Sequence, residues 1–405
     1  METADAQPAN IKAIALVSGA HLYSHLFIFL LPPLFPLIKE DMGVGYTELA
    51  FAIAVFNIVT ALTQAPVGFL VDRMGARTLL VAALIIESLA LVAIGLLPSY
   101  PLMLVMMAIA GLANAVFHPA DYVILNASVS DSKMGRAFSV HTASGFFGGF
   151  LGPALAIPIA AMYSWNLAVV MLAGSGIVMA AIVVAGSRVL RDQAEGAHKT
   201  KSESSGNGLA LLLSLPMLIG FLFYAGLSAY GQAFGSFSTS ALSSMYEEPL
   251  TTLGVILGLY LFASPVGVLC GGWIADKITA HDRFTSACIV CMTIVTFIIA
   301  AVDLPLWLLG VLFTSAGWLF GVLSPSRDML IRRMTPPSEM GKVFGFVTTG
   351  FNAAGIVGPP IFGYLLDLGE PSLVYWAAGI LCLLTIPTVM FTGARGRQFA
   401  ATANA

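Results

Sequence analysis

Long apolar runs separated by short polar segments make up almost the whole chain. There are twelve such runs, at roughly 11–37, 47–71, 78–97, 102–127, 136–162, 166–186, 209–240, 250–275, 284–301, 306–331, 343–367 and 373–393. A helix needs about 20 apolar residues to cross the hydrocarbon core of a bilayer, whereas membrane strands show about ten residues of alternating hydrophobicity, which these runs lack. Because backbone groups in lipid must bond to one another, the pattern predicts twelve transmembrane helices.

Composition and charge support the same prediction. Hydrophobic residues make up 58% and charged residues 10% of the chain, against about 45–50% and about 25% in soluble domains. Of the 18 Lys and Arg residues, only Lys39 and Arg327 fall outside the termini and the loops after even-numbered runs. The positive-inside rule then predicts that both termini are cytoplasmic. No basic stripe remains for nucleic acid, so we expect the lipid bilayer as a partner and no nucleic acid.

The second half of the chain repeats the first. Three motifs return: Gly68-Phe-Leu-Val-Asp72-Arg73 as Gly272-Trp-Ile-Ala-Asp276-Lys277, Gly135-Arg136 as Gly341-Lys342, and Gly152-Pro153 as Gly358-Pro359. The last two pairs share an offset of 206 residues (341 − 135 and 358 − 152). We therefore expect an all-α protein of two pseudo-symmetric six-helix bundles, 1–186 and 209–405, joined by a cytoplasmic linker over 187–208. Such repeats are typical of secondary transporters that work by alternating access.

The loop after the second run carries a family resemblance. Gly68-Phe-Leu-Val-Asp72-Arg73-Met-Gly75-Ala-Arg77 resembles the G-x-x-x-D-R/K-x-G-x-R signature of the major facilitator superfamily, and Asp276-Lys277 lie in its weaker second copy. The resemblance implies the major facilitator fold and transport of a small organic substrate. It also implies a gating role for these residues, in which the acid caps a neighbouring helix start, as anions favour helix N-termini.

Two further motifs are similar to exporters. His21 and Phe117-His118-Pro119 resemble the fosmidomycin-resistance-type efflux subgroup, which implies the inner (cytoplasmic) membrane of a prokaryote. Gly148-x-x-x-Gly152-Pro153 resembles the core of the antiporter motif of drug exporters. Glycines four residues apart also let two helices approach closely and proline bends a helix, so a packing seam with a kink is the alternative reading here and for Gly358-Pro359.

Ionisable side chains inside the predicted spans are the first candidates for chemistry, because each costs several kcal/mol in lipid by most estimates. They are His21, His25, Glu87, His118, Asp121, His141, Arg327 and Asp328. His21 and His25 are four apart and share a helical face, and the family's architecture implies that spans 1, 4, 7 and 10 line the central cavity. His118 and Asp121 also share a helical face, and a carboxylate beside an imidazole makes a proton-binding unit. The alternative is that these two side chains only fit a helix bend at Pro119.

The remaining candidates admit two readings each. Glu87 is a structural group or a proton site, and His141 extends a proton path or belongs to the gate. Adding 206 to Asp121 gives Arg327, so opposite charges occupy equivalent positions of the repeat. One reading is that Asp121 and Arg327 form an ion pair when the cytoplasmic side of the transporter closes, or bind a charged substrate when it opens. The other is that Asp328 neutralises Arg327 locally. Tyr224, Tyr230, Gln232 and Trp318 are residue types that shape a mostly apolar pocket.

These observations predict a monomeric secondary active transporter for a small organic molecule. Efflux by proton antiport is the leading hypothesis, with a proton on Asp121 and His118 or on His21 and His25. The alternative is a proton-coupled symporter for uptake of a carboxylate-bearing anion held by Arg327. No H-E-x-x-H or G-x-S-x-G motif occurs, so we expect no enzyme. No cofactor is expected, and no metal, because the sequence assigns neither a cysteine ligand nor a further acid that would orient the histidines on an ion.

Overall fold

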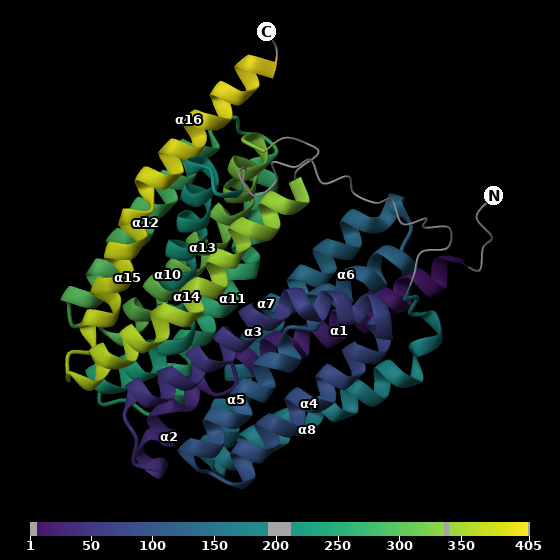
Figure 1. Ribbon diagram of the computed structural model, residues 1–405. Coiled ribbons are helices and arrows are strands. Elements are labelled where there is room, and N and C mark those ends of the chain that lie inside the picture. The colour runs from purple at the N-terminus through teal and green to yellow at the C-terminus, as the bar shows by residue number, and fades with distance from the viewer. Residues whose placement is uncertain (1–5, 193–211, 336–339, 404–405) are drawn as a thin grey trace. The chain divides into compact units, whose positions relative to one another are not determined.

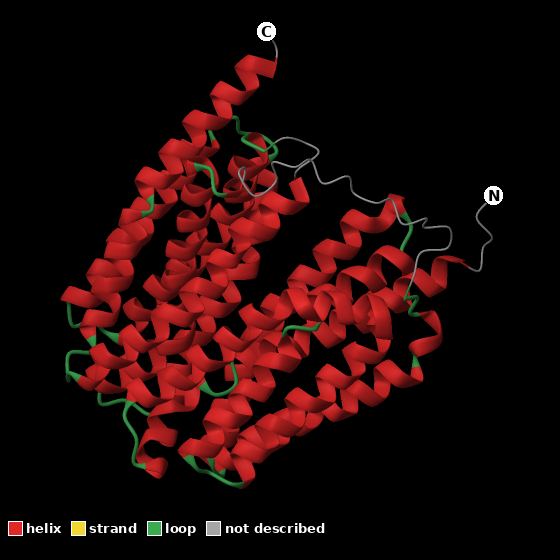
Figure 2. Ribbon diagram, viewed as in Figure 1, coloured by secondary structure: helices red, strands yellow, loops and turns green. Residues whose placement is uncertain are grey.

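The helices of the protein follow the predicted spans closely. The structure is a computed structural model that describes residues 6–192, 212–335 and 340–403, and within these ranges it contains helices and no strand (Figure 2). Eleven described helices or helix pairs are long and apolar enough to cross a membrane. The twelfth predicted span, 343–367, falls in the helix α14 (Met340–Asp367), which is not among those eleven. The prediction of an all-α membrane protein is confirmed.

The chain divides into two compact units, namely Met1–Val44 with Phe51–Lys201, and Gly45–Ala50 with Ser202–Ala405. The predicted linker over 187–208 lies outside the described residues from 193 onward. The first part of the chain forms α1 (Ala6–Ile28), α2 (Phe35–Met42), α3 (Tyr46–Met74), α4 (Ala76–Leu96), α5 (Tyr100–Asn114), α6 (Phe117–Ser128), α7 (Asp131–Met162) and α8 (Trp165–Ala185). The second part forms α10 (Leu215–Met245), α11 (Leu250–Ala275), α12 (His281–Ala301), α13 (Leu306–Arg333), α14, α15 (Ser372–Leu384) and α16 (Ile386–Ala403), as labelled in Figure 1.

Three predicted spans are interrupted, each near a proline. The first span ends as α1 at Ile28, and a 3₁₀ turn over Pro32–Leu34 leads into α2. The fourth span breaks at residues 115–116, between α5 and α6. Pro119 explains this break, because a proline ring clashes with the carbonyl four residues earlier and offers it no amide hydrogen. The last span breaks in the same way at Thr385, two residues before Pro387.

Pairs of helices in each unit meet at glycines. In the first unit a Cβ on Gly111 of α5 would overlap the carbonyl oxygen of Phe56 on α3, and in the second unit a Cβ on Gly317 of α13 would overlap that of Tyr260 on α11. These two pairs are related by offsets of 206 and 204 residues (317 − 111 and 260 − 56). The sequence repeat therefore extends to the places where helix backbones touch.

Candidate functional site

Five ionisable side chains from three helices gather in the first unit. His21 and His25 lie one turn apart on α1, His118 and Asp121 follow the break at the start of α6, and His141 lies on α7. The His21 ring centroid is 4.8 Å from that of His25, 5.2 Å from that of His118 and 3.8 Å from that of His141. We call these five residues the imidazole cluster. The sequence predicted the two pairs, but not that α7 would bring His141 to both.

Asp121 is the centre of the imidazole cluster. Its side chain is 0% exposed, and its Oδ2 lies 3.3 Å from Nδ1 of His21 and 3.7 Å from Nε2 of His141. The His21 and His141 rings stack with an angle of 27° between their planes. Two imidazole nitrogens thereby lie near one carboxylate oxygen. His118, the partner that the sequence suggested for Asp121, contacts the ring of His21 instead.

The cluster contains polar atoms that are buried without a hydrogen bond. Both carboxylate oxygens of Asp121, Nδ1 of His21 and both ring nitrogens of His141 have no hydrogen-bond partner among the described residues. Leaving such groups unpaired costs about 1–3 kcal/mol each, and more when they are charged. A proton shared between the carboxylate and an imidazole lowers this cost. The arrangement is therefore chemically suited to take up and release a proton.

The same histidines meet the spacing of a metal site. One ring nitrogen each from His21, His118 and His141 lies within 4.8 Å of the other two, and imidazole nitrogens are common ligands of zinc and related ions. His118 is exposed, whereas His21 and His141 are buried. These are the residues that could hold one transition-metal ion, and the absence of a metal stays a prediction from the sequence.

Gly145, one turn after His141 on α7, makes room for the cluster. A Cβ at this position would lie 2.8 Å from Nε2 of His21 and 3.0 Å from Cδ2 of His25. We expect Gly145→Ala to displace both rings from their positions in the cluster and to lower the rate of transport by about tenfold, since small misplacements of reacting groups are costly. The measurement is substrate flux in proteoliposomes.

Gly149→Ala is the matched control for that variant. It lies one turn further along α7, and its added Cβ would lie 3.2 Å from the ring of Phe29 instead of an imidazole. If the two variants lose flux equally while both remain folded, the effect of Gly145 comes from helix packing and not from the imidazole cluster.

Glu87 lies elsewhere in the first unit. It is 0% exposed on α4, and Nδ2 of Asn114 donates hydrogen bonds to its two carboxylate oxygens at 3.1 and 3.5 Å. Asn114 also donates to Ser24 at 3.4 Å. Sequence reasoning missed Asn114, although an amide that ends α5 four residues before His118 was a visible signal. Glu87 is thus held by a neutral amide.

A second polar group lies on α13 and α10 in the second unit. Arg327 donates from Nε to Oδ1 of Asp328 at 2.8 Å, and the hydroxyl of Tyr224 donates to the same oxygen at 2.5 Å. The guanidinium carbon lies 4.4 Å from the Tyr224 ring centroid and 5.4 Å from that of Phe351. Sequence reasoning missed Phe351, which lies 206 residues after Gly145 (351 − 145) and occupies the equivalent position of the repeat.

Three other predicted pocket residues do not join either group. Tyr230 is buried, its hydroxyl lies 3.2 Å from that of Thr296, and its ring stacks on Phe234. Gln232 accepts a hydrogen bond from Ser236. Trp318 on α13 is 38% exposed. Their contacts are those of helix packing.

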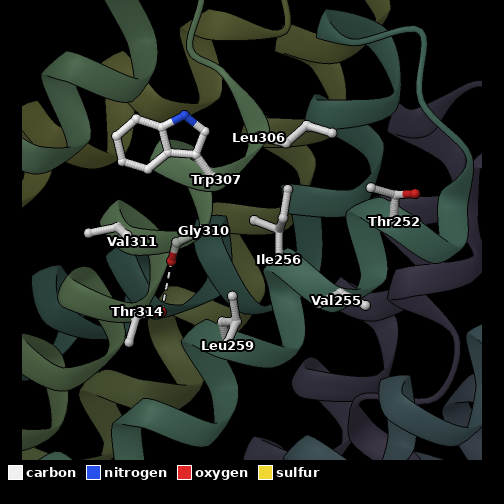
Figure 3. A pocket seen from close by; sticks show the side chains of 9 residues that line it. All are labelled: Thr252, Val255, Ile256, Leu259, Leu306, Trp307, Gly310, Val311 and Thr314. Atoms are coloured by element: carbon white, nitrogen blue, oxygen red, sulfur yellow. Dashed lines mark hydrogen bonds between the residues drawn. The ribbon is translucent and has the colours of Figure 1, made fainter.

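An apolar groove of about 490 Å³ lies at the N-terminal ends of α11 and α13. Figure 3 shows its lining, with Trp307, Gly310 and Val311 of α13 beside Ile256 and Leu259 of α11. No ionisable side chain lines this groove. It offers no group for proton coupling.

The predicted gating loop caps a helix with a different acid. Asp72 is exposed and makes no hydrogen bond or ion pair with another described residue, whereas Oδ1 of Asp192 accepts the backbone amide hydrogen of Arg77 at 2.7 Å. Arg77 also donates from Nη1 to the carbonyl of Ser187 at 3.3 Å. Gly75 precedes α4 with φ of 91°, a conformation that favours glycine. The cap at the start of α4 therefore comes from the segment after α8.

The remaining gating and packing residues lie in or directly after the last turns of α3 and α11, or in helix seams. Gly68 has open space beside it, Arg73 and Asp276 are exposed, and Lys277 lies 3.4 Å above the ring of Trp273. The kink and seam residues lie inside α7 and α14, as follows: Gly148 against the carbonyl of Leu22, Gly152 against that of Leu26, Gly358 beside Phe362, and Pro153 and Pro359 within their helices.

Comparison with known proteins identifies the family. The Fosmidomycin resistance protein of Escherichia coli (strain K12) is 25% identical over 398 residues, which cover 95% of this chain and 94% of the relative. The Multi-drug resistance efflux pump PmrA of Streptococcus pneumoniae serotype 4 (strain ATCC BAA-334 / TIGR4) is 25% identical over 343 residues, 82% of this chain and 84% of the relative. A solved structure of a bacterial homolog to the human lysosomal transporter Spinster has a TM-score of 0.78 at 14% identity and covers 98% of each chain, which shows the fold. Residues 17–315 and 217–400 match the Major Facilitator Superfamily, and the chain belongs to this family of membrane transporters.

Proposed function

We propose that this transporter exports a small organic molecule in exchange for protons. The observation that carries the proposal is the imidazole cluster, where a fully buried carboxylate lies beside His21 and His141 and has no hydrogen-bond partner in the part of the chain that the structure describes. Ionisable groups inside a membrane protein mark ion pathways and proton relays. The names of two relatives, a resistance protein and an efflux pump, support export as the direction.

In the proposed cycle a proton from outside neutralises the pair formed by Asp121 and an imidazole. Proton and substrate then disfavour each other's binding, so that loading one releases the other. Coupling of this kind requires that each ligand binds the inward-open and outward-open states with different affinity. His118, the exposed member of the cluster, is suited to pass the proton between solvent and Asp121.

Transport by the purified protein in liposomes tests this function. We expect a proton gradient to drive uphill movement of a probe such as the cation ethidium, with a matching proton flux reported by a pH-sensitive dye in the lumen. Proton-coupled transport should persist when a metal chelator is present. If the chelator abolishes coupling, the coupling ion is a bound metal and not the proton. Equal flux with and without the gradient, for every cation, anion and neutral compound tried, would rule out proton coupling.

Uptake of an organic anion by proton symport is the second candidate. It is favoured by Arg327, whose side chain is only 12% exposed and lies over two aromatic rings. Its Nε is occupied by Asp328, but a guanidinium has further N–H donors for a carboxylate.

Arg327→Gln separates the two candidates. If Arg327 anchors an anion, we expect the variant to bind benzoate at least about tenfold more weakly, because hydrogen bonds to charged groups contribute about 1.5–3 kcal/mol. Its affinity for neutral compounds should then stay at the wild-type level. Ligand-induced thermal stabilisation of the purified protein measures this difference. Arg332→Gln, an exposed arginine on the same helix, is the control. Equal losses for charged and neutral ligands would assign Arg327 to local neutralisation with Asp328.

A further inference from the structure

A basic pocket lies in the second unit, and none of its lining residues belongs to the polar groups described above. Its volume is about 580 Å³. It is formed by the segment between α11 and α12, the first turn of α12, the end of α13 and the middle of α16. The residues that line it are Thr279, Ala280, Asp282, Arg283, Leu330, Arg333, Thr392, Gly393, Gly396 and Arg397.

The charge of this basic pocket is unbalanced. Arg283, Arg333 and Arg397 come from three different helices and line one space, and Asp282 is the single acid among the lining residues. Arg397 donates from Nη1 to Oδ2 of Asp282 at 2.5 Å. Because that carboxylate compensates one guanidinium, the charges of Arg283 and Arg333 are left for an anion.

The basic pocket is held in shape by its own contacts. Arg333 donates from Nη1 to the carbonyl of Thr279 at 2.6 Å, which fixes one guanidinium at the edge of the pocket. On α16, a Cβ added to Gly393 would lie 2.5 Å from Cβ of Asp282, and one added to Gly396 would lie 3.2 Å from Cβ of Arg333. The two glycines therefore allow α16 to approach the charged side chains closely while leaving the space between them.

We infer that this basic pocket binds the phosphate group of an anionic phospholipid. A guanidinium group matches the geometry of a phosphate and donates two parallel hydrogen bonds to two of its oxygens. The pocket lies where α11 ends, α12 begins and α13 ends, at the membrane surface that the distribution of cations places in the cytoplasm. Basic pockets between transmembrane helices on that side bind lipid head groups. The inference does not depend on the substrate or on proton coupling.

Thermal unfolding of the purified full chain in detergent tests the inference. Phosphatidylglycerol is expected to raise the Tm of the wild type, phosphatidylcholine much less, and inorganic phosphate only at high concentration. In Arg283→Gln/Arg333→Gln the stabilisation by phosphatidylglycerol should fall by about half or more, because binding to the folded state is what raises the Tm. Equal shifts from free phosphate and from the lipid would retain the phosphate site but overturn its assignment to a lipid.

Two neighbouring arginines provide matched controls. Arg332 on α13 and Arg395 on α16 are exposed and do not line the basic pocket, so Arg332→Gln/Arg395→Gln removes the same charge from the same side of the protein. This control should keep the full lipid effect. If both double variants lose it equally, or if phosphatidylcholine stabilises as well as phosphatidylglycerol, the site does not exist. Arg283→Gln alone, at an exposed position, replaces the double variant if that variant fails to fold.

Discussion

Asp121→Asn is expected to abolish uphill transport while leaving exchange of substrate for substrate. A gradient of two pH units stores about 2.7 kcal/mol per proton, enough for about 100-fold accumulation, and the variant should reach no accumulation at all. An asparagine amide keeps the size of the buried side chain but cannot take up the proton that loads Asp121 in the proposed cycle. The measurement is substrate accumulation in proteoliposomes under a pH gradient, compared with counterflow without one.

Glu87→Gln is the matched control for Asp121→Asn. Glu87 is equally buried in the same unit, and its partner is the neutral side chain of Asn114. A glutamine keeps its size, so we expect coupling to survive. Accumulation by Asp121→Asn to the wild-type level would exclude Asp121 as the coupling group. Loss of coupling in Glu87→Gln alone would transfer that role to Glu87.

Most of the fold was predictable because the bilayer restricts the chain so strongly. Apolar runs of membrane length can only be helices there, and the repeat at an offset of 206 residues indicated two related halves. Of the breaks in the spans, the sequence suggested only a bend at Pro119, and the break before Pro387 was not predicted although the proline was visible. A proline in a span is tolerated when neighbouring groups satisfy the freed carbonyl, and this depends on packing that the sequence does not show.

The candidate site was predictable as a set of residues but only partly as an arrangement. The cost of ionisable groups in lipid identified every member of the imidazole cluster from the sequence. Which of them meet depends on how α1, α6 and α7 pack, and Gly145, which admits the two rings of α1, has no chemistry of its own to signal this. The sequence likewise did not show that Asp192 caps α4, because it does so from a segment 115 residues away. The family resemblance had predicted Asp72 as the capping acid.

Gly321→Ala is expected to destabilise the second unit strongly. A Cβ at Gly321 of α13 would overlap the carbonyl oxygen of Ser264 on α11 and would lie 2.9 Å from the backbone nitrogen of Val268. Backbone atoms of a packed helix cannot rotate away as a side chain can, so the two helices must separate. Overpacking usually costs about 1–3 kcal/mol, and we expect this variant at the upper end, with a lower Tm and a lower yield of monodisperse protein.

Gly310→Ala separates this steric effect from the substitution itself. Gly310 is on the same helix, and its added Cβ would meet only the terminal Cδ1 of Leu259 at 3.2 Å, an atom that moves by rotation of a side-chain bond. Alanine is favoured over glycine inside a helix by about 1 kcal/mol, so this control should unfold at the wild-type temperature or above it. Thermal denaturation of both variants in the same detergent measures the difference. If Gly321→Ala matches the control, the packing of α11 against α13 does not depend on backbone contact at this position. The repeat would then relate this contact to that of Gly111 and Phe56 in sequence only, and not in packing.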